Sequence, residues 1–444
     1  MEFSQYSITD LNKPLKSQGV IMNRESFAKK ISKFLFYGWI IIALSALATF
    51  FSSPGQTYSI SAFINSYIVD FGYSRTLISS IYSAATILSG FLLVFMGKAV
   101  DRFGQRRMLV IAGTTLSLAC FFNSFVANIP MIFIGFFLLR YFGQGSLTLI
   151  PGSLVPQWFE KKRALAISLL TLGTIFGTII VPRINIYMIE TYGWQTAWRG
   201  WSLLILVLFV PLMWIFIVNK PENIGMLPDN MPVRSNHDIA YELELVTQRS
   251  FTLNQAIKTK EFWFIGLISM LIPMISTGMI FHFYSIMSER GINETETATI
   301  IGFIALPGLS MPLIAGTIID RYRSKYIIFT SLLFIMFDLI YIQYTSTPLT
   351  AGIFLLIYGF FSNVQSITLN VIWVRYFGRL YLGSIRGAST VFAVVGSALG
   401  TVPFGLSYDM TGSYKTAFIL MAMATFMGMI LSLTIKKPTK KSVY

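Results

Sequence analysis

Long apolar stretches dominate this sequence and recur along its whole length. A helix that crosses a bilayer needs about 20 predominantly apolar residues, and twelve stretches reach that length with few charges inside them. Only 12% of the 444 residues are charged, whereas a soluble domain carries about 25%. We therefore predict an all-α integral membrane protein of twelve transmembrane helices, near residues 34–69, 74–97, 107–127, 129–158, 163–190, 199–218, 261–288, 297–319, 326–345, 348–375, 383–408 and 415–435.

The predicted helices divide into two groups of six. The longest polar segment between two of them, residues 219–260, follows helix 6. A loop sequence occurs in both groups, as GKAVDRFGQRR from Gly97 and as GTIIDRYRSK from Gly316. Small residues also occur at matching positions of the two groups: Gly173 and Gly177 of helix 5 correspond to Gly396 and Gly400 of helix 11. We expect two pseudo-symmetric bundles and connecting segments: an N-terminal tail at 1–33, bundles at 34–218 and 261–435, a linker at 219–260 and a tail at 436–444.

The distribution of Lys and Arg predicts the orientation, because cytoplasmic loops carry an excess of these residues. Most of the 34 fall in the two tails, the linker and the loops after helices 2, 4, 8 and 10, and the opposite loops hold only Arg75, Arg199, Arg290 and Lys415. We expect both termini in the cytoplasm and a multi-pass location in the plasma membrane, as in a bacterial inner membrane. The net charge of +15 follows from this topology and from attraction to anionic lipid headgroups, so no nucleic-acid partner is inferred.

Polar residues interrupt the first predicted helix. Its centre reads SSPGQTY, from Ser52 to Tyr58. Pro54 and Gly55 loosen a helix, and the backbone groups that they release are tolerated in a bilayer only where protein or a water-filled cavity satisfies them. Gln56 and Tyr58 therefore either line a polar path or lie at a kink that neighbouring hydroxyls satisfy.

An arginine lies deep in predicted helix 4. At 1.5 Å per residue, Arg140 is about 16 Å into the span, near the centre of the bilayer. A guanidinium there costs several kcal/mol unless it faces a partner or water. Arg140, with Gln144 one turn later, is either the charge contact of an anionic substrate or a structural arginine bonded to a carbonyl or an acid. Arg183, in helix 5, either faces the cavity or extends toward the headgroups.

Further polar residues lie in the second half. Asn363, Gln365 and Asn370 of helix 10 are candidate substrate contacts, as is His282 of helix 7. His282 is also the candidate for proton coupling, although a hydrogen-bonded structural histidine fits as well. Asp338 is the one acid inside a predicted span, and we expect it to have a structural role at the periphery of the bundle.

The sequence lacks the motifs of a motor or an enzyme. No G-x-x-x-x-G-K-[ST] loop is present to hold the phosphates of ATP. The two histidines and the single cysteine, Cys120, form no metal-ligand pattern. We expect neither a catalytic activity nor a cofactor, so any uphill transport must use a gradient.

The assembled motifs resemble the major facilitator superfamily. GKAVDRFGQRR is similar to its loop motif after helix 2, and the resemblance extends over essentially the whole chain. Finer features are similar to the monocarboxylate and oxalate-formate branch, namely the initial YGW, FGYSRT at 71–76, WFEKKRALA at 158–166 and KPENIGMLPD at 220–229.

The resemblance implies a rocker-switch transporter that works as a monomer, with a cavity lined chiefly by helices 1, 4, 7 and 10. It also implies that Asp101 engages the start of helix 11, near Ser384 to Arg386, and steadies the outward-facing state. The two loop motifs supply the other candidate gating residues: Gly97, Arg102, Gly104, Arg106, Asp320 and Arg321.

The substrate is predicted only as a class. Monocarboxylate carriers commonly have a Lys in helix 1 and an Asp-Arg pair in helix 8, and this chain has no interior charge in its helix 8. We therefore expect a small organic solute, most simply an organic anion such as a monocarboxylate bound through Arg140, with or without a co-transported proton. Efflux of drug-like, apolar or cationic compounds is the alternative, and a non-transporting nutrient sensor is a remote one.

Overall fold

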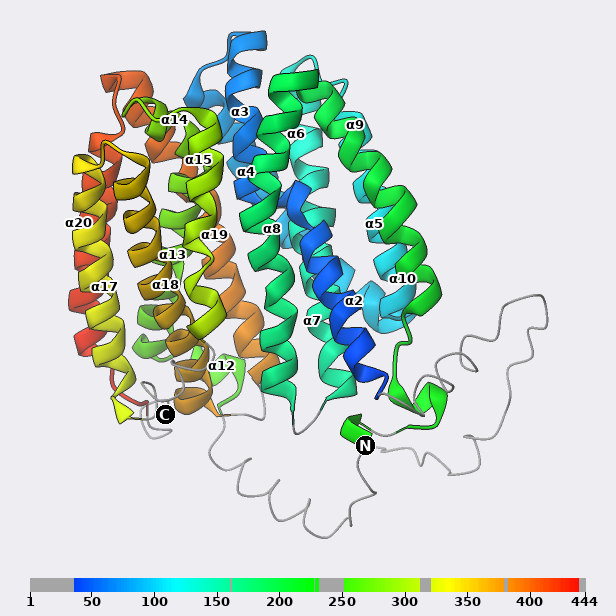
Figure 1. The fold of residues 1–444 in the computed structure, drawn as a ribbon. Helices are drawn as coiled ribbons and strands as arrows, with labels where there is room; N and C mark the ends of the chain where they lie inside the picture. The colour runs from blue at the N-terminus through cyan, green and yellow to red at the C-terminus, as the bar shows by residue number, and fades with distance from the viewer. Residues whose placement is uncertain are drawn as a thin grey trace.

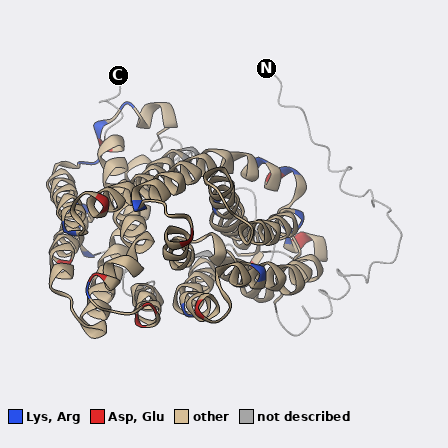
Figure 2. Ribbon diagram, turned by 90° about the horizontal axis from the view of Figure 1, so that it is seen from above, with Lys and Arg blue, Asp and Glu red and all other residues tan. Residues whose placement is uncertain are grey.

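The protein is helical throughout the part of the chain that the structure describes. A computed structural model describes residues 36–159, 162–226, 228–230, 251–311, 321–378 and 382–438. Within these ranges ten helices are long and apolar enough to cross a membrane. Figure 1 shows the blue-to-green helices of the first half beside the green-to-red helices of the second, and the view from above in Figure 2 shows few charged residues along them.

The first half contains predicted helices 1 to 6. Its helices are α2 (Gly38–Phe51), α3 (Thr57–Phe71), α4 (Arg75–Phe103), α5 (Gln105–Asn123), α6 (Ile129–Leu138), α7 (Leu147–Trp158), α8 (Arg163–Tyr192), α9 (Trp194–Leu204) and α10 (Val210–Phe216). A 3-10 turn, Ser53–Gly55, separates α2 from α3. Two π-helical segments, Leu139–Ser146 and Ile205–Phe209, join α6 to α7 and α9 to α10.

The second half repeats this plan. Its helices are α12 (Leu253–Ala256), α13 (Lys260–Phe281), α14 (Phe283–Ser288), α15 (Glu294–Ile300), α17 (Ser324–Tyr341), α18 (Pro348–Phe377), α19 (Leu382–Thr411) and α20 (Lys415–Thr434), with 3-10 turns at Ile301–Ile304 and Ile342–Tyr344. Predicted helix 8 runs into residues 312–320, which lie outside the described part. Predicted helix 3 is α5, a 19-residue helix that is not among the ten apolar spans.

Some predicted helices depart from a regular α-helix along their length. Predicted helix 1 consists of α2 and α3 on either side of the Pro54 turn, and predicted helix 4 consists of α6, the π segment and α7. Predicted helix 7 breaks at His282, between α13 and α14. Residues 38–71 and 129–158 each form one apolar span, as predicted for helices 1 and 4. Pro54 and Gly55 indicated the turn in helix 1, whereas the π segment of helix 4 and the break at His282 were not predicted, because apolar length does not reveal where a backbone changes its hydrogen-bond pattern.

The matching glycines of the two halves allow close helix packing. A Cβ on Gly173 of α8 would lie 1.8 Å from the Ala46 carbonyl oxygen of α2. A Cβ on Gly400 of α19 would lie 2.0 Å from the Met274 carbonyl oxygen of α13. Only glycine permits this backbone approach between membrane helices.

The two halves meet closely at one end of the molecule and separate at the other. We call these the Gly72 end, where α3 passes into α4, and the Gly104 end, where α4 passes into α5 (upper and lower in Figure 1). Near the Gly72 end, a Cβ on Gly405 of α19 would lie 3.0 Å from the Thr76 Cα of α4. Toward the Gly104 end, a Cβ on Gly97 of α4 would meet no atom within 4 Å.

Candidate functional site

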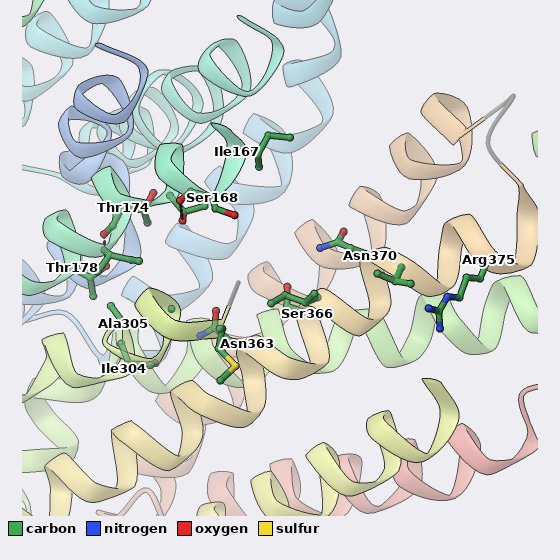
Figure 3. A pocket seen from close by; sticks show the side chains of 16 residues that line it. Ile167, Ser168, Thr174, Thr178, Ile304, Ala305, Asn363, Ser366, Asn370 and Arg375 are labelled. Carbon is green, nitrogen blue, oxygen red and sulfur yellow. Dashed lines mark hydrogen bonds between the residues drawn. The ribbon is translucent and has the colours of Figure 1, made fainter. Parts of the chain in front are cut away.

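A cavity of about 720 Å³ lies between the two halves. Three chain segments form its wall: α8 from the first half, residues 304–311 that follow α15, and α18 from the second half. The polar lining groups are hydroxyls and amides, together with one guanidinium, and the described lining residues include no acid. These polar residues are Ser168, Thr171, Thr174, Thr178, Asn363, Ser366, Asn370 and Arg375 (Figure 3).

Helical spacing sets the polar groups of α18 in a row. Asn363, Ser366 and Asn370 are three to four residues apart, so they share one face of the helix, and Arg375 follows near its last turn. Figure 3 shows them in this order along α18, opposite Thr174 and Thr178 of α8. The Asn363 Nδ2 donates to the Gly359 carbonyl oxygen at 2.8 Å, which fixes the side-chain amide at the cavity wall.

The cavity ends toward Gly72, where α8 packs against the second half. A Cβ on Gly302 would lie 3.0 Å from the Ile179 Cα, and one on Gly308 would lie 3.2 Å from the Ile175 side chain. Arg375 and Ser168 lie on the other side, near the Gly104 ends of their helices. A solute can therefore be held between the halves near the middle of the molecule, with polar groups extending toward the Gly104 end.

Arg140 is buried within the first half and does not line the cavity. Its side chain is 2% exposed, and it lies in the π segment that packs against the Pro54 turn. The Nη1 donates to the Gly55 carbonyl oxygen at 3.2 Å and to Thr57 Oγ1 at 3.4 Å, and the Nε donates to Thr86 Oγ1 at 3.1 Å. The guanidinium carbon lies 5.0 Å from the ring centroid of Tyr82. Its hydrogen bonds thus join helices 1, 2 and 4 of the first half.

The other predicted residues of the first half belong to the same break or lie apart from the cavity. Gln56 donates from Nε2 to Ser52 Oγ at 2.9 Å, and the Tyr58 hydroxyl lies 2.9 Å from Ser53 Oγ. Gln144 is half-buried in the π segment. Arg183 is exposed, on the face of α8 that carries the exposed Ile180 and Tyr187.

Two of the three predicted residues of α18, Asn363 and Asn370, line the cavity. Gln365 faces away from it and is fully buried, and neither of its amide atoms has a hydrogen-bond partner among the described residues. The expected lining by helices 1, 4, 7 and 10 therefore differs from the cavity that the structure shows, to which α8 and residues 304–311 contribute with α18. The polar groups of helix 1 are instead hydrogen-bonded within that helix, to Arg140 of helix 4 and to Tyr82 of helix 2.

His282 joins the two halves near the Gly72 end. Its Nε2 lies 2.9 Å from Ser79 Oγ of α4 and 3.2 Å from the Thr401 carbonyl oxygen of α19. The Ser79 hydroxyl donates to the Arg75 carbonyl oxygen at 2.7 Å, and a carbonyl oxygen can only accept, so Nε2 carries the proton. The Nδ1 is buried with no hydrogen-bond partner among the described residues.

The loop motif from Gly97 to Arg107 contacts its own half. Gly104 has φ +83°, and a Cβ there would lie 2.6 Å from Asn219 Nδ2. The Asn219 Oδ1 accepts from the Arg106 backbone N–H at 2.9 Å, and the Arg106 guanidinium carbon lies 4.4 Å from the centroid of a Trp214 ring. Asp101 and Arg102 are exposed. In the second motif Arg321 is exposed, and Asp320 lies outside the described residues.

The sequence did not single out the hydroxyls of α8 or Arg375. Ser168, Thr171, Thr174 and Thr178 recur every three to four residues, and this helical stripe is a signal that could have found them. Arg375 lies in the last turn of α18, where a basic residue fits equally well as a topology signal. The side-chain contacts between the two halves could likewise be identified only once the fold was known.

This arrangement is that of a helical membrane protein with a polar cavity between two groups of helices. The model of the Major Facilitator Superfamily matches residues 39–401, and the chain belongs to this superfamily. It is a multi-pass membrane protein of this family. A bacterial homologue of the human lysosomal transporter Spinster, whose crystal structure is described as inward-facing and occupied, shares the fold. The TM-score is 0.65 at 11% identity, covering 91% of this chain and 97% of that one.

Its curated relatives are transporters with different substrates. Monocarboxylate transporter 14 of Mus musculus is 29% identical over 164 residues, which are 36% of this chain and 31% of that protein. The alignment thus spans about a third of that relative. The gallate transporter of Pseudomonas putida is 23% identical over 66% of this chain and 68% of its own. Multidrug resistance protein MdtG of Escherichia coli is 23% identical over 77% and 80%.

Proposed function

We propose that this protein carries a small organic anion across the plasma membrane by alternating access. The observation that supports it is the composition of the cavity wall, where the described residues offer hydroxyls, amides and one guanidinium but no carboxylate. Such a wall attracts an anion and offers no counter-charge to a cation. The names of the gallate and monocarboxylate relatives point to the same class of solute. In the proposed orientation, the Gly104 end and both termini face the cytoplasm of a bacterial cell.

The proposed residues take distinct roles. Asn363 and Asn370 form hydrogen bonds with the polar groups of the solute. Arg375 attracts the carboxylate of the solute as it enters from the Gly104 end. Arg140 acts one step away, because its three hydrogen bonds hold the broken helices 1 and 4 together beside the cavity. Closure of the Gly104 end and opening of the Gly72 end would then expose the solute on the other side.

Uptake by purified protein in liposomes tests the function. The panel contains small aliphatic and aromatic carboxylates, neutral sugars, and lipophilic cations of the kind that multidrug carriers export. We expect counterflow exchange with at least one carboxylate, and competition by others. Transport of the cations with none by any carboxylate would contradict the proposal and favour the efflux alternative.

Arg375→Gln is expected to raise the KM for the anion about three- to tenfold, with a smaller change in maximal rate. A hydrogen bond to a charged group contributes about 1.5–3 kcal/mol, and exposure of Arg375 to solvent at the mouth reduces this value. Initial rates over a range of substrate concentrations measure the effect. Arg107→Gln is the matched control, because Arg107 is an exposed arginine near the same end that does not line the cavity and is not among the candidate gating residues. An equal rise of KM in both variants would contradict a role of Arg375 in binding.

We further propose that a proton accompanies the anion and that His282 is its carrier. His282 occupies the contact between α4 and α19, which must separate when the Gly72 end opens, and Arg75, Asp409 and Tyr414 surround it. We expect His282→Asn to retain counterflow exchange and to lose most of the accumulation driven by a pH gradient. If accumulation persists at the wild-type level, the proton travels elsewhere, for example on the substrate itself.

A further inference from the structure

We infer that Asp409 is the Gly72-end counterpart of Asp101, so that α4 and α19 carry two reciprocal Asp latches, of which only one is closed at a time. This inference rests on the proposed alternating access. It assigns a role to the FGYSRT sequence at 71–76, which the function proposed above leaves unexplained.

The latch at the Gly72 end is closed in this structure. The Asp409 Oδ2 accepts a hydrogen bond from the Thr76 backbone N–H at 2.8 Å, across the boundary between the halves. Thr76 belongs to the first turn of α4, whose backbone N–H groups have no partner within the helix. The carboxylate therefore caps a helix N-terminus of the other half, where a negative charge is stabilised by the helix dipole.

Other side chains reinforce this contact. The guanidinium carbon of Arg75 lies 4.8 Å from the ring centroid of Tyr408 in α19. Its Nη1 donates to Asn65 Oδ1 at 3.3 Å, and the Asn65 Nδ2 donates to Glu294 Oε1 of the second half at 2.9 Å. Residues of α3 and α4 thus contact α15 and α19 at the Gly72 end.

The same pair of helices separates toward its other end. A Cβ on Gly90 would lie 2.4 Å from Val394 Cγ1, whereas one on Gly97, two turns further, would meet nothing within 4 Å. An apolar gap of about 270 Å³ lies here, between residues of α4, α7 and α19 that include Val94 and Val391. The two helices therefore form a wedge that is closed at Asp409 and open near Asp101.

The positions of the two aspartates are equivalent in the two helices. α4 ends at Phe103 and α19 ends at Thr411, so each aspartate lies two residues before the end of its helix. The helices pack side by side and run in opposite directions, since α4 starts at the Gly72 end and α19 finishes there. Each carboxylate consequently lies at the end where the other helix begins. Asp101 is exposed here, and a hinge motion that closes the Gly104 end would bring it to the start of α19 while withdrawing Asp409 from Thr76.

Spin-label distance measurements on the purified full chain without substrate test the inference. Label pairs at Val69 and Leu406 report on the Gly72 end, and pairs at Phe95 and Val391 report on the Gly104 end. All four side chains are exposed, and Cys120→Ser removes the native thiol. We expect Asp409→Ala to raise the ratio of Gly72-open to Gly72-closed molecules about three- to tenfold. Asp409→Asn, which keeps one acceptor oxygen, is expected to give a smaller change in the same direction.

The reciprocal variant and a matched control complete the test. Asp101→Ala is expected to lower the Gly104-closed population about three- to tenfold, and the double variant to return the balance toward that of the wild type. Asp70→Ala is the control, because Asp70 is an acid at the same end that accepts from Trp194 Nε1 at 2.7 Å within its own half. No shift in Asp409→Ala, or an equal shift in Asp70→Ala, would overturn the inference. Because no substrate is present, a failure of anion transport leaves this result unaffected, whereas a chain that never opens at the Gly72 end would contradict alternating access itself.

Discussion

Arg140→Ala is expected to destabilise the first half of the protein and to slow transport of every substrate alike. The substitution removes the donor to the Gly55 carbonyl and to Thr86 Oγ1, while Thr57 Oγ1 keeps its hydrogen bond with the Tyr82 hydroxyl at 2.9 Å. A buried group that loses its partner costs about 1–3 kcal/mol. Release of a desolvated charge offsets part of this cost, so we expect a net loss of about 2 kcal/mol. Thermal unfolding of the detergent-purified protein measures the stability.

Arg140→Lys separates this positioning role from a direct contact with the substrate. A lysine keeps the charge but has neither the planar fork nor the Nε donor that reaches Thr86. We therefore expect Lys to rescue little of the lost stability and transport rate. The sequence-based hypothesis of a charge contact predicts the opposite pattern. A selective rise in KM for anions in Arg140→Ala, with normal stability and with rescue by Lys, would show that Arg140 binds the substrate.

Gly173→Ala adds one methyl group to α8, and we expect it to lower the stability of the protein more than any other such addition to this helix. The new Cβ would lie 1.8 Å from the Ala46 carbonyl oxygen and 2.2 Å from Thr49 Oγ1. Because one of these atoms is backbone, α2 and α8 must move apart, and overpacking of this kind costs about 1–3 kcal/mol or more. The yield of monodisperse protein and its midpoint of thermal unfolding report the loss.

Gly152→Ala is the matched control for that prediction. It adds the same methyl to a glycine of the neighbouring helix α7, where a Cβ would meet no atom within 4 Å. Replacing glycine by alanine inside a helix gains roughly 0.5–1 kcal/mol. Equal stability of the two variants would contradict the tight packing of α2 on α8.

Features that depend on local chemistry could be predicted from the sequence. Pro54 and Gly55 indicated a break in helix 1, and a 3-10 turn lies there. Small residues at matching positions of helices 5 and 11 indicated close packing, and a Cβ on Gly173 or Gly400 would collide with backbone atoms of α2 or α13. The family could likewise be recognised from the sequence, because the loop motif after helix 2 and the repeat of six helices are each visible in continuous stretches of sequence.

Features that depend on the tertiary contacts of a side chain could not be predicted. The depth of Arg140 in the bilayer shows that it needs a partner, but depth alone does not distinguish a substrate from the carbonyl of Gly55. Asn363 and Gln365 look equivalent in the sequence, and the rotation of α18 places one at the cavity wall and buries the other. Asp409 was overlooked because an acid at a helix end is ordinary until the helix that it caps is known.

The π segment at Leu139–Ser146 also sets the register of the helix that follows it. A π-helical stretch holds one more residue than an α-helix of the same path, and each residue of an α-helix turns by about 100°. Deleting one residue from this segment would therefore restore regular α-helix over the same path and leave the orientation of α7 unchanged, whereas deleting one residue from the regular helix α6 would rotate all of α7 by about that angle. In the second case Ile150 and Leu154, now fully buried, would turn away from the core, so the π segment tolerates the loss of one residue better than the α-helix before it.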